Sequence, residues 1–329
     1  MMRKRRSNRY SGTNFLAVLI ACGALAIAHL NSDPIAIGGS PNEESVNLMP
    51  PVLALPPTPS LPQHNAVTQD SSNDESGQEV LPAENPGVLK GIWALKMTST
   101  LLRKGTKSFT KVTDYTASMY RQERLNGVLG TGQTIEMKLK HEPFSLYMKW
   151  LSGDEKGQQA IYVEDQNDGK LLVQPGGIKG RLTGVLKLDP EGSLAMAQSR
   201  HPATQAGLVE LAKTILKFQD EDLKRGTGFQ CELVDNQTFD DRPCYIFTCV
   251  YDSEEINSVY RKSVIYVDKE LSMPVCVKNF CWAKDANPET IDDETLLEFY
   301  AYSGLELYKE LEVADFDAKN RSYRMRVRR

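Results

Sequence analysis

The stretch 134-TIEMKLKHEPFSLYMKW-150 decides the fold class of this chain of 329 residues. Apolar and polar residues alternate along it, and its apolar row consists of Ile135, Met137, Leu139, Phe144, Leu146, Met148 and Trp150. In a strand, successive side chains point to opposite faces of the sheet. The stretch therefore predicts two strands, 134–140 and 144–150, of an antiparallel sheet with one face on a core and the other in water.

Further strands are predicted on both sides of this stretch. They cover residues 114–124, 158–164, 170–174, 183–188, 229–238, 243–252, 258–268, 273–282 and 294–303. Asn126-Gly127 and Asp168-Gly169 have the residue types that tight hairpin turns require. Helical spacing of apolar residues predicts a long helix in 88–112 and an amphipathic helix in 204–217.

The order of these elements predicts an α+β fold: a helix, about six strands, a second helix and about five strands. A meander of about 10–11 strands must curl or close to protect its edges, and helices are the natural cover for its concave face. We expect a strongly curved antiparallel half-barrel lidded by helices. Its concave face is apolar and incompletely filled, which favours a ligand cavity. The predicted lining is the apolar row named above, with Leu208, Leu211 and Ile215 from the lid.

The N-terminus has the pattern of an export signal. Residues 1–14 carry five basic and no acidic residues, and the apolar run 15-FLAVLIACGALAIAHL-30 follows. A basic segment before a short apolar one is typical of exported proteins. Three fates stay open: cleavage after Ala28, lipidation at Cys22 within a lipobox-like Leu-Ile-Ala-Cys, or retention of 1–30 as a membrane anchor. In each case the rest of the chain leaves the cytoplasm for the periplasm or cell envelope.

Residues 31–86 form a segment of different composition. It holds ten of the 17 prolines, eight acidic residues and neither lysine nor arginine. Such a segment buries too little apolar surface to offset the entropy of ordering. We interpret it as a disordered spacer between a membrane and a folded domain at 87–329, or as a low-complexity tail without that role.

The remaining five cysteines are compatible with one disulfide. They are Cys231, Cys244, Cys249, Cys276 and Cys281, and their spacing fits neither a zinc site nor a redox motif. If 229–238 and 243–252 form a hairpin that turns at Asp240-Asp241, Cys231 and Cys249 lie nearly opposite each other. An exported protein permits a Cys231–Cys249 bridge. The alternative is that all five are buried thiols.

His201 is the one histidine in a context that suggests chemistry. As a general base it would need an orienting carboxylate, and Asp189 or Glu191 of the preceding turn are the nearest candidates. The competing interpretation is structural, because Pro202 restricts His201 to extended geometry and Thr204 can cap the helix that follows. We favour the structural interpretation. The sequence predicts no catalytic residue, no metal site and no cofactor, and its net charge of −4 argues against a nucleic-acid partner.

Several motifs resemble a family of exported bacterial proteins known as domain of unknown function 1571. They are 143-PFSLYMKWLSGDEKGQQAIYVEDQNDGKLLVQPGG-177, 200-RHPATQAGL-208 and a terminal Asp-Phe-Asp-x-x-Asn-x-x-Tyr at 315–323. That family is similar to periplasmic lipoprotein carriers of the LolA type, which implies an unclosed barrel around an apolar cavity. The resemblance supplies no catalytic residue. The long spacer and possible tether depart from a freely diffusing carrier.

Two functions from different classes follow. The first is a non-catalytic envelope protein that binds a lipid or the acyl chain of an acylated protein, with the membrane contacted through the N-terminus. The second is a structural or interaction protein whose barrel is filled by its own side chains. A hydrolase that uses His201 is a remote third. An open apolar cavity would favour the first function and a filled one the second.

Overall fold

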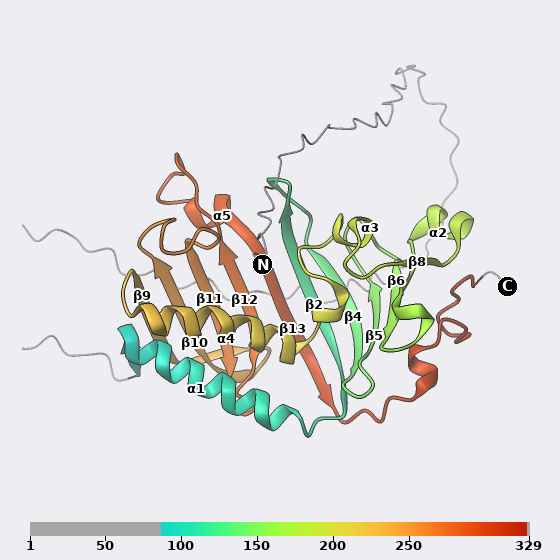
Figure 1. Cartoon of the computed structure of the whole chain (residues 1–329), viewed down its shortest axis with the longest axis horizontal. Coiled ribbons are helices and arrows are strands. Elements are labelled where there is room, and N and C mark those ends of the chain that lie inside the picture. Colours follow the sequence, from blue (N-terminus) through green and yellow to red (C-terminus); the bar gives the residue numbers. More distant parts are fainter. Residues whose placement is uncertain (1–86, 328–329) are drawn as a thin grey trace, which may run out of the picture. The chain divides into compact units, whose positions relative to one another are not determined.

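Thirteen strands form one antiparallel sheet in the computed structural model, which describes residues 87–327 (Figure 1). The predicted signal or anchor at 1–30, with Cys22, and the spacer at 31–86 lie outside these residues. The strands are β1 (Val88–Lys90), β2 (Asp114–Leu125), β3 (Val128–Leu129), β4 (Gln133–Lys140), β5 (Ser145–Trp150), β6 (Gln159–Val163), β7 (Leu171–Gln174), β8 (Leu186–Leu188), β9 (Phe229–Phe239), β10 (Arg242–Tyr251), β11 (Lys262–Asp268), β12 (Pro274–Phe280) and β13 (Leu296–Leu307).

Helices occupy the segments between these strands. They are α1 (Gly91–Phe109), α2 (Gly177–Thr183), α3 (Ser193–Met196), α4 (Leu208–Arg225) and α5 (Ile291–Thr295), with 3₁₀ turns at η1 (Asn167–Gly169), η2 (Ala203–Gln205) and η3 (Val313–Phe316). The two long helices, α1 and α4, lie side by side across β9–β12 (Figure 1). We call the sheet face that they cover the inner face.

The sheet is open, because β1 and β8 lie at its two ends in the order β1-β9-β10-β11-β12-β13-β2-β4-β5-β6-β7-β8, with β3 paired to β2. Neighbours in the sequence are joined by hairpins, such as β9 and β10 through Asp240 and Asp241, which both have positive φ. The last strand departs from this pattern. β13 returns to the centre of the sheet and pairs with both β12 and β2.

All eleven predicted strands are present, and the sheet has two more than the predicted maximum. The additional strands, β1 and β3, have three and two residues, which is too short to show an alternating period. Both predicted turns connect hairpins: Asn126-Gly127 joins β2 to β3, and Asp168-Gly169 lies in the longer connection from β6 to β7.

The second predicted helix begins four residues later than expected and ends eight later. Thr204 lies in η2 and does not cap α4; the N-cap is Gly207, with a φ of 100°. A Cβ atom at this position would lie 2.5 Å from Leu139 Cδ1 and 2.7 Å from the Tyr115 hydroxyl. Glycine is therefore required here both for its backbone conformation and for the close approach of the chain to the sheet.

Both faces of the sheet are partly covered, in contrast to the expectation that one face meets water. On the outer face, Tyr147 of β5 is buried and stacks on Tyr323 with ring centroids 4.0 Å apart. The Gln159 side chain also donates to the Tyr323 carbonyl at 2.9 Å. The C-terminal segment thus lies on the outer face of β5 and β6, where it covers side chains that alternation alone predicts to be exposed.

Candidate functional site

A cavity of about 180 Å³ lies between the inner face of the sheet, α4 and the segment 188–206. Its lining comes from β5–β8, from the central strands β2 and β13, and from β10–β12. The cavity is apolar towards both ends. The first lobe, beside β5–β8, is lined by Met148, Trp150, Ala160, Leu171, Val173, Leu188 and Leu194. The second lobe, beside α4 and β10–β12, is lined by Leu211, Ile215, Phe218, Phe247, Ile265 and Val277.

The structure separates the ten predicted lining residues into three groups. Met148, Trp150, Leu211 and Ile215 line the cavity. Another four pack in the core of the same face, namely Ile135, Met137, Leu146 and Leu208. The last two, Leu139 and Phe144, line a second pocket of about 430 Å³. The core group has no free volume because the start of α4 packs onto β4 and β5 there. The assignment of these residues to lipid binding stays a prediction.

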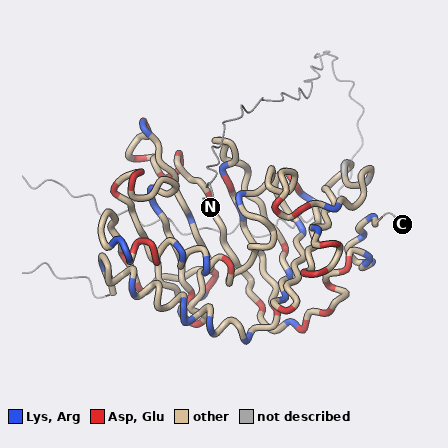
Figure 2. The backbone as a smooth tube through the Cα atoms, in the orientation of Figure 1, with Lys and Arg blue, Asp and Glu red and all other residues tan. Residues whose placement is uncertain are grey.

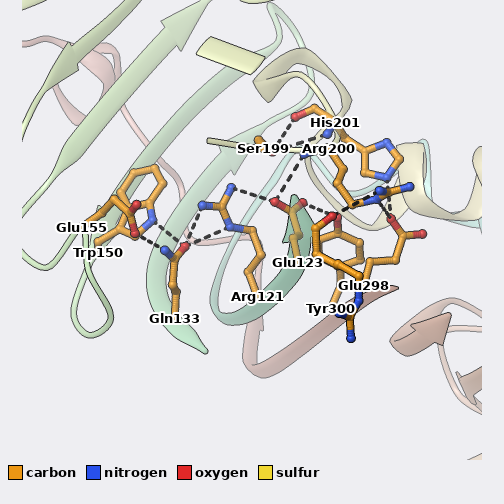
Figure 3. Close-up of polar contacts among 11 residues, drawn as sticks. Arg121, Glu123, Gln133, Trp150, Glu155, Ser199, Arg200, His201, Glu298 and Tyr300 are labelled. Atoms are coloured by element: carbon orange, nitrogen blue, oxygen red, sulfur yellow. Dashed lines mark hydrogen bonds and ion pairs between the residues drawn. The ribbon is translucent and has the colours of Figure 1, made fainter. Parts of the chain in front are cut away.

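A row of polar side chains crosses the inner face between the two lobes (Figure 3). Arg121 of β2 donates to Gln133 Oε1 from Nη2 at 2.6 Å and from Nε at 3.0 Å. The same oxygen accepts from Trp150 Nε1 at 3.1 Å. Arg121 also lies 3.8 Å from the carboxylate of Glu123, which accepts from the Tyr300 hydroxyl. The row therefore joins β4, β2 and β13 through hydrogen bonds rather than through apolar contacts.

Glu298 of β13 accepts four hydrogen bonds at the β13 end of this row, with only 2% of its side chain exposed. Its Oε1 accepts from Tyr260 at 2.9 Å and from Asn279 at 2.7 Å. Its Oε2 accepts from Arg200 Nε at 2.9 Å and from His201 Nε2 at 3.1 Å. Burial alone would favour the protonated carboxyl, but the hydrogen bond and charge of His201, the hydrogen bond of Asn279 and the charge of Arg200 outweigh it and lower the pKa of Glu298 to about 2. The buried carboxylate is thus charged and fully paired.

His201 is oriented by Glu298, and the prediction that Asp189 or Glu191 would orient it is wrong. The hydrogen bond to Glu298 raises the pKa of His201 despite partial burial of the ring. Asp189 instead accepts from Lys170 and from the backbone N–H of Glu191. Asp189 and Glu191 are thus near His201 in the sequence but are not hydrogen-bond partners of its ring.

The nearby serine does not complete a catalytic pair. The Ser199 hydroxyl donates to the His201 carbonyl at 2.8 Å, and within residues 87–327 no serine or cysteine side chain hydrogen-bonds to the His201 ring. Arg200 and His201 instead hold the segment before α4 onto the middle of the sheet. This arrangement supports the structural interpretation of the Arg-His-Pro turn, with Glu298 as a partner that sequence reasoning missed.

The missed polar residues did leave a signal in the sequence. Arg121 and Glu123 continue the inward row Tyr115, Ala117 and Met119 of β2 with the same parity. In β13, Glu298 has the parity of Tyr300 and Tyr302, which also line the cavity. A charged residue in the inward row of a strand must be paired, so the break in the pattern identifies these positions without identifying their partners.

The predicted cysteine pair lies in the hairpin that was expected. Cys231 and Cys249 are opposite each other in β9 and β10, and their buried Sγ atoms are 3.3 Å apart as thiols. The disulfide stays a prediction. Among the described residues there is no group of three or more His, Cys, Asp or Glu side chains placed to hold a metal ion. Nor does the part of the chain from 87 to 327 contain a helix long and apolar enough to cross a membrane.

A family model described as "protein of unknown function (DUF1571)" matches residues 112–325. No curated protein matches the chain. Similar solved structures include lipoprotein LppX of Mycobacterium tuberculosis, which is 10% identical with a TM-score of 0.38 and coverage of 66% of this chain and 98% of that one.

Two further similar structures have related descriptions. A Vibrio parahaemolyticus domain described as an outer membrane lipoprotein-sorting protein is 12% identical with a TM-score of 0.31, over 70% of this chain and all of that one. A LolA superfamily protein of Nitrosomonas europaea is 11% identical with a TM-score of 0.28, over 67% of this chain and 97% of that one. At these identities and TM-scores the likeness carries no information on ligand or activity.

Proposed function

This chain belongs to the DUF1571 family of proteins of unknown function, and we propose from its cavity that it is a non-catalytic cell-envelope protein that binds the acyl chain of a lipid or lipoprotein. In this proposal the open sheet is a half-barrel and α1 with α4 is its lid. The single observation that carries it is the pair of apolar lobes along the inner face. Each methylene group that enters such a lobe from water contributes about 0.8 kcal/mol.

The size of the cavity limits how an acyl chain can be bound. Its volume of about 180 Å³ is below the ~300–1,000 Å³ of most ligand pockets. A bound chain therefore enters with part of its length, or displaces lining side chains. Met119 and Met148 are suited to such displacement because methionine is unbranched and flexible. Leu194 is 73% exposed and lines the cavity, so it is the side chain that can move at least cost.

The polar row supports a non-catalytic function. Each of its carboxylates is already paired, and the His201 ring nitrogen that faces Glu298 is engaged in holding the segment 198–202. A general base needs a proton donor within hydrogen-bond reach, and His201 has neither a serine nor a cysteine hydrogen-bonded to its ring among the described residues. The row is better suited to fixing the two lobes relative to each other than to proton transfer.

The location in the cell envelope rests on the sequence of residues 1–30. We propose that this segment directs export and that, if it is retained or lipidated at Cys22, it ties the protein to a membrane. The spacer at 31–86 then separates the cavity from that membrane. The acyl chain would come from a membrane lipid or an acylated protein within reach of this tether.

Native mass spectrometry of the full chain, exported and purified without detergent, tests the proposal. We expect an adduct of lipid mass that disappears on organic extraction. Ala160 lines the first lobe and is 2% exposed, so Ala160→Leu should fill that lobe and reduce the adduct. Ala314→Leu adds the same atoms at an exposed position outside the cavity and should leave the adduct unchanged. The adducts are compared only if both variants are folded, which is checked by an unfolding temperature within a few degrees of that of the wild type.

The small volume also favours one competing function, a structural or interaction protein with a filled barrel. A clean apo mass, with no uptake of added phospholipid or fatty acid, would contradict lipid binding and support this second function. Met148→Asp gives a further separation. If wild type takes up lipid, the charge in this variant should abolish the uptake. If wild type takes up no lipid and the variant unfolds, Met148 is a packing residue of a filled barrel.

A further inference from the structure

The inner stripe of α4 changes from apolar to polar inside the cavity. Leu211 and Ile215 line the cavity from this helix, and Gln219 and Asp222 continue the same stripe at helical spacing. Both polar residues are buried, with exposures of 3% and 4%. Burying a polar side chain is unfavourable unless it finds partners, so each placement needs a reason.

Asp222 has its partners within the protein. Its Oδ2 accepts from the Tyr251 hydroxyl at 2.7 Å, and its Oδ1 accepts from Arg225 Nη1 at 2.9 Å. Burial nevertheless raises the pKa of Asp222, because the charged carboxylate is disfavoured in this environment more than these donors favour it. This end of the second lobe therefore resists a further negative charge.

Gln219 is only half satisfied. Its Oε1 accepts from the Ser99 hydroxyl of α1 at 2.8 Å, which fixes the amide between the two helices. Its Nε2 is buried and has no hydrogen-bond partner among the described residues. An unpaired buried amide is uncommon, and Gln219 is one of the residues that line the cavity, so a ligand atom that reaches its amide can supply the missing acceptor.

We propose that Gln219 Nε2 donates a hydrogen bond to the carbonyl oxygen of an uncharged acyl ester or amide whose hydrocarbon chain lies in the second lobe. This inference rests on the proposed function and gives it a chemical class of ligand. A carbonyl oxygen accepts without carrying charge, which suits a site beside Asp222. A fatty-acid carboxylate bound at Gln219 would place a second negative charge close to Asp222, because residues three apart on a helix face have Cβ atoms ~5–6 Å apart. Such a ligand is disfavoured.

The test is displacement of diphenylhexatriene, an apolar fluorescent probe, from the full-length protein. The competitors are decane, decanoate, methyl decanoate and N-methyldecanamide, each titrated into wild type and Gln219→Leu. Leucine keeps much of the side-chain volume and removes the donor. We expect the ester or the amide to lose about tenfold in affinity, or ~1.4 kcal/mol, while decane changes less than twofold. The competitor that loses more identifies the source, an O-acyl lipid or an N-acylated protein.

Gln166→Leu is the matched control, because it makes the same substitution at an exposed position outside the cavity. It should not change the affinity of the ester or the amide, and thermal unfolding should show both variants folded. In wild type, decanoate should compete more weakly than its methyl ester. If Gln219→Leu lowered the affinity of decane as much as that of the carbonyl ligands, or lowered no affinity, this inference would be overturned and the proposed function would stand. If wild type bound neither diphenylhexatriene nor decane, the proposed function itself would fail.

Discussion

His201 Nε2 lies 3.1 Å from Glu298 Oε2, although 97 residues separate the two along the chain. The contact fixes the turn before α4 to the central strand of the sheet, between the two apolar lobes. Because Glu298 also accepts from Arg200, Tyr260 and Asn279, this one carboxylate joins the 198–202 segment to the residues just before β11, to β12 and to β13. In Figure 2 the positions of Lys and Arg and those of Asp and Glu are interspersed along the described part of the backbone.

Glu298→Gln should be strongly destabilising. The change leaves Arg200 and His201 beside a neutral amide, and removing one partner of a buried charge pair costs about 3–5 kcal/mol. Urea unfolding measures the loss. Glu306→Gln is the control, because Glu306 pairs with Lys309 at the surface with 60% of its side chain exposed, and should cost at most ~1 kcal/mol. Equal effects of the two variants would contradict the central role of Glu298.

Acid should remove the contribution of Glu298 over a defined range. Its folded pKa of about 2 is below the ordinary value of 4.5, so its contribution is complete above pH 4.5 and is lost as the pH falls towards 2. At ~1.4 kcal/mol per pKa unit, the contribution is roughly 3 kcal/mol. The free energy of unfolding should therefore fall more steeply with acid in wild type than in Glu298→Gln. Parallel curves for the two proteins would show that folding does not lower the pKa of Glu298.

A rise in pH, rather than a fall, should remove the contribution of His201 to the stability of the fold. The bond to Glu298 raises the folded pKa of His201 above its ordinary value of 6.5. Its contribution is therefore complete below pH 6.5 and is lost as the pH rises through the folded pKa. Wild type should lose stability over that range, and His201→Gln should not. The ring-proton chemical shift of His201, followed by NMR, would give the folded pKa, and a value below 6.5 would contradict the prediction.

The Cys231–Cys249 pair should be oxidised in exported protein. Directly opposite residues of an antiparallel pair have Cα atoms about 4.5–5.5 Å apart, within the range that a disulfide requires. A bridge over this hairpin should stabilise the protein by about 3 kcal/mol. Peptide mapping without reduction should find the two cysteines in one cross-linked pair. Protein made in a reducing cytoplasm is the control, and free thiols at both positions in the exported protein would contradict the bridge.

Gly105→Ala should destabilise the protein although alanine favours helices. Gly105 lies inside α1, and a Cβ atom there would be 2.0 Å from the Ser272 carbonyl oxygen. The backbone must shift to admit it, at a cost of about 1–3 kcal/mol. Ser108→Ala, at an exposed position of the same helix, should be within ~0.5 kcal/mol of wild type. Thermal unfolding compares the two, and a stabilising Gly105→Ala would show that α1 does not approach the β11–β12 connection this closely.

The sequence by itself determined the strands, because alternation of apolar and polar side chains is a local property. The stretch 134–150 predicts β4 and β5, and the residue types at 240–241 predict the hairpin that brings Cys231 opposite Cys249. The inward row of β2 also contains Arg121 and Glu123, a sign of polar groups in the core that the sequence analysis missed. Each of these inferences depends on neighbours along the chain.

Only the tertiary structure decided which strands meet and which side chains remain at a cavity. β13 pairs with β12 and with β2, which begins 182 residues earlier than β13, and this return places Glu298 against Arg200 and His201. It also decided that α4 fills the space over Ile135 and Met137 but leaves Gln219 at the wall of the second lobe. Long-range pairing depends on the sum of packing over the whole sheet, whereas the period of a strand depends on the backbone alone.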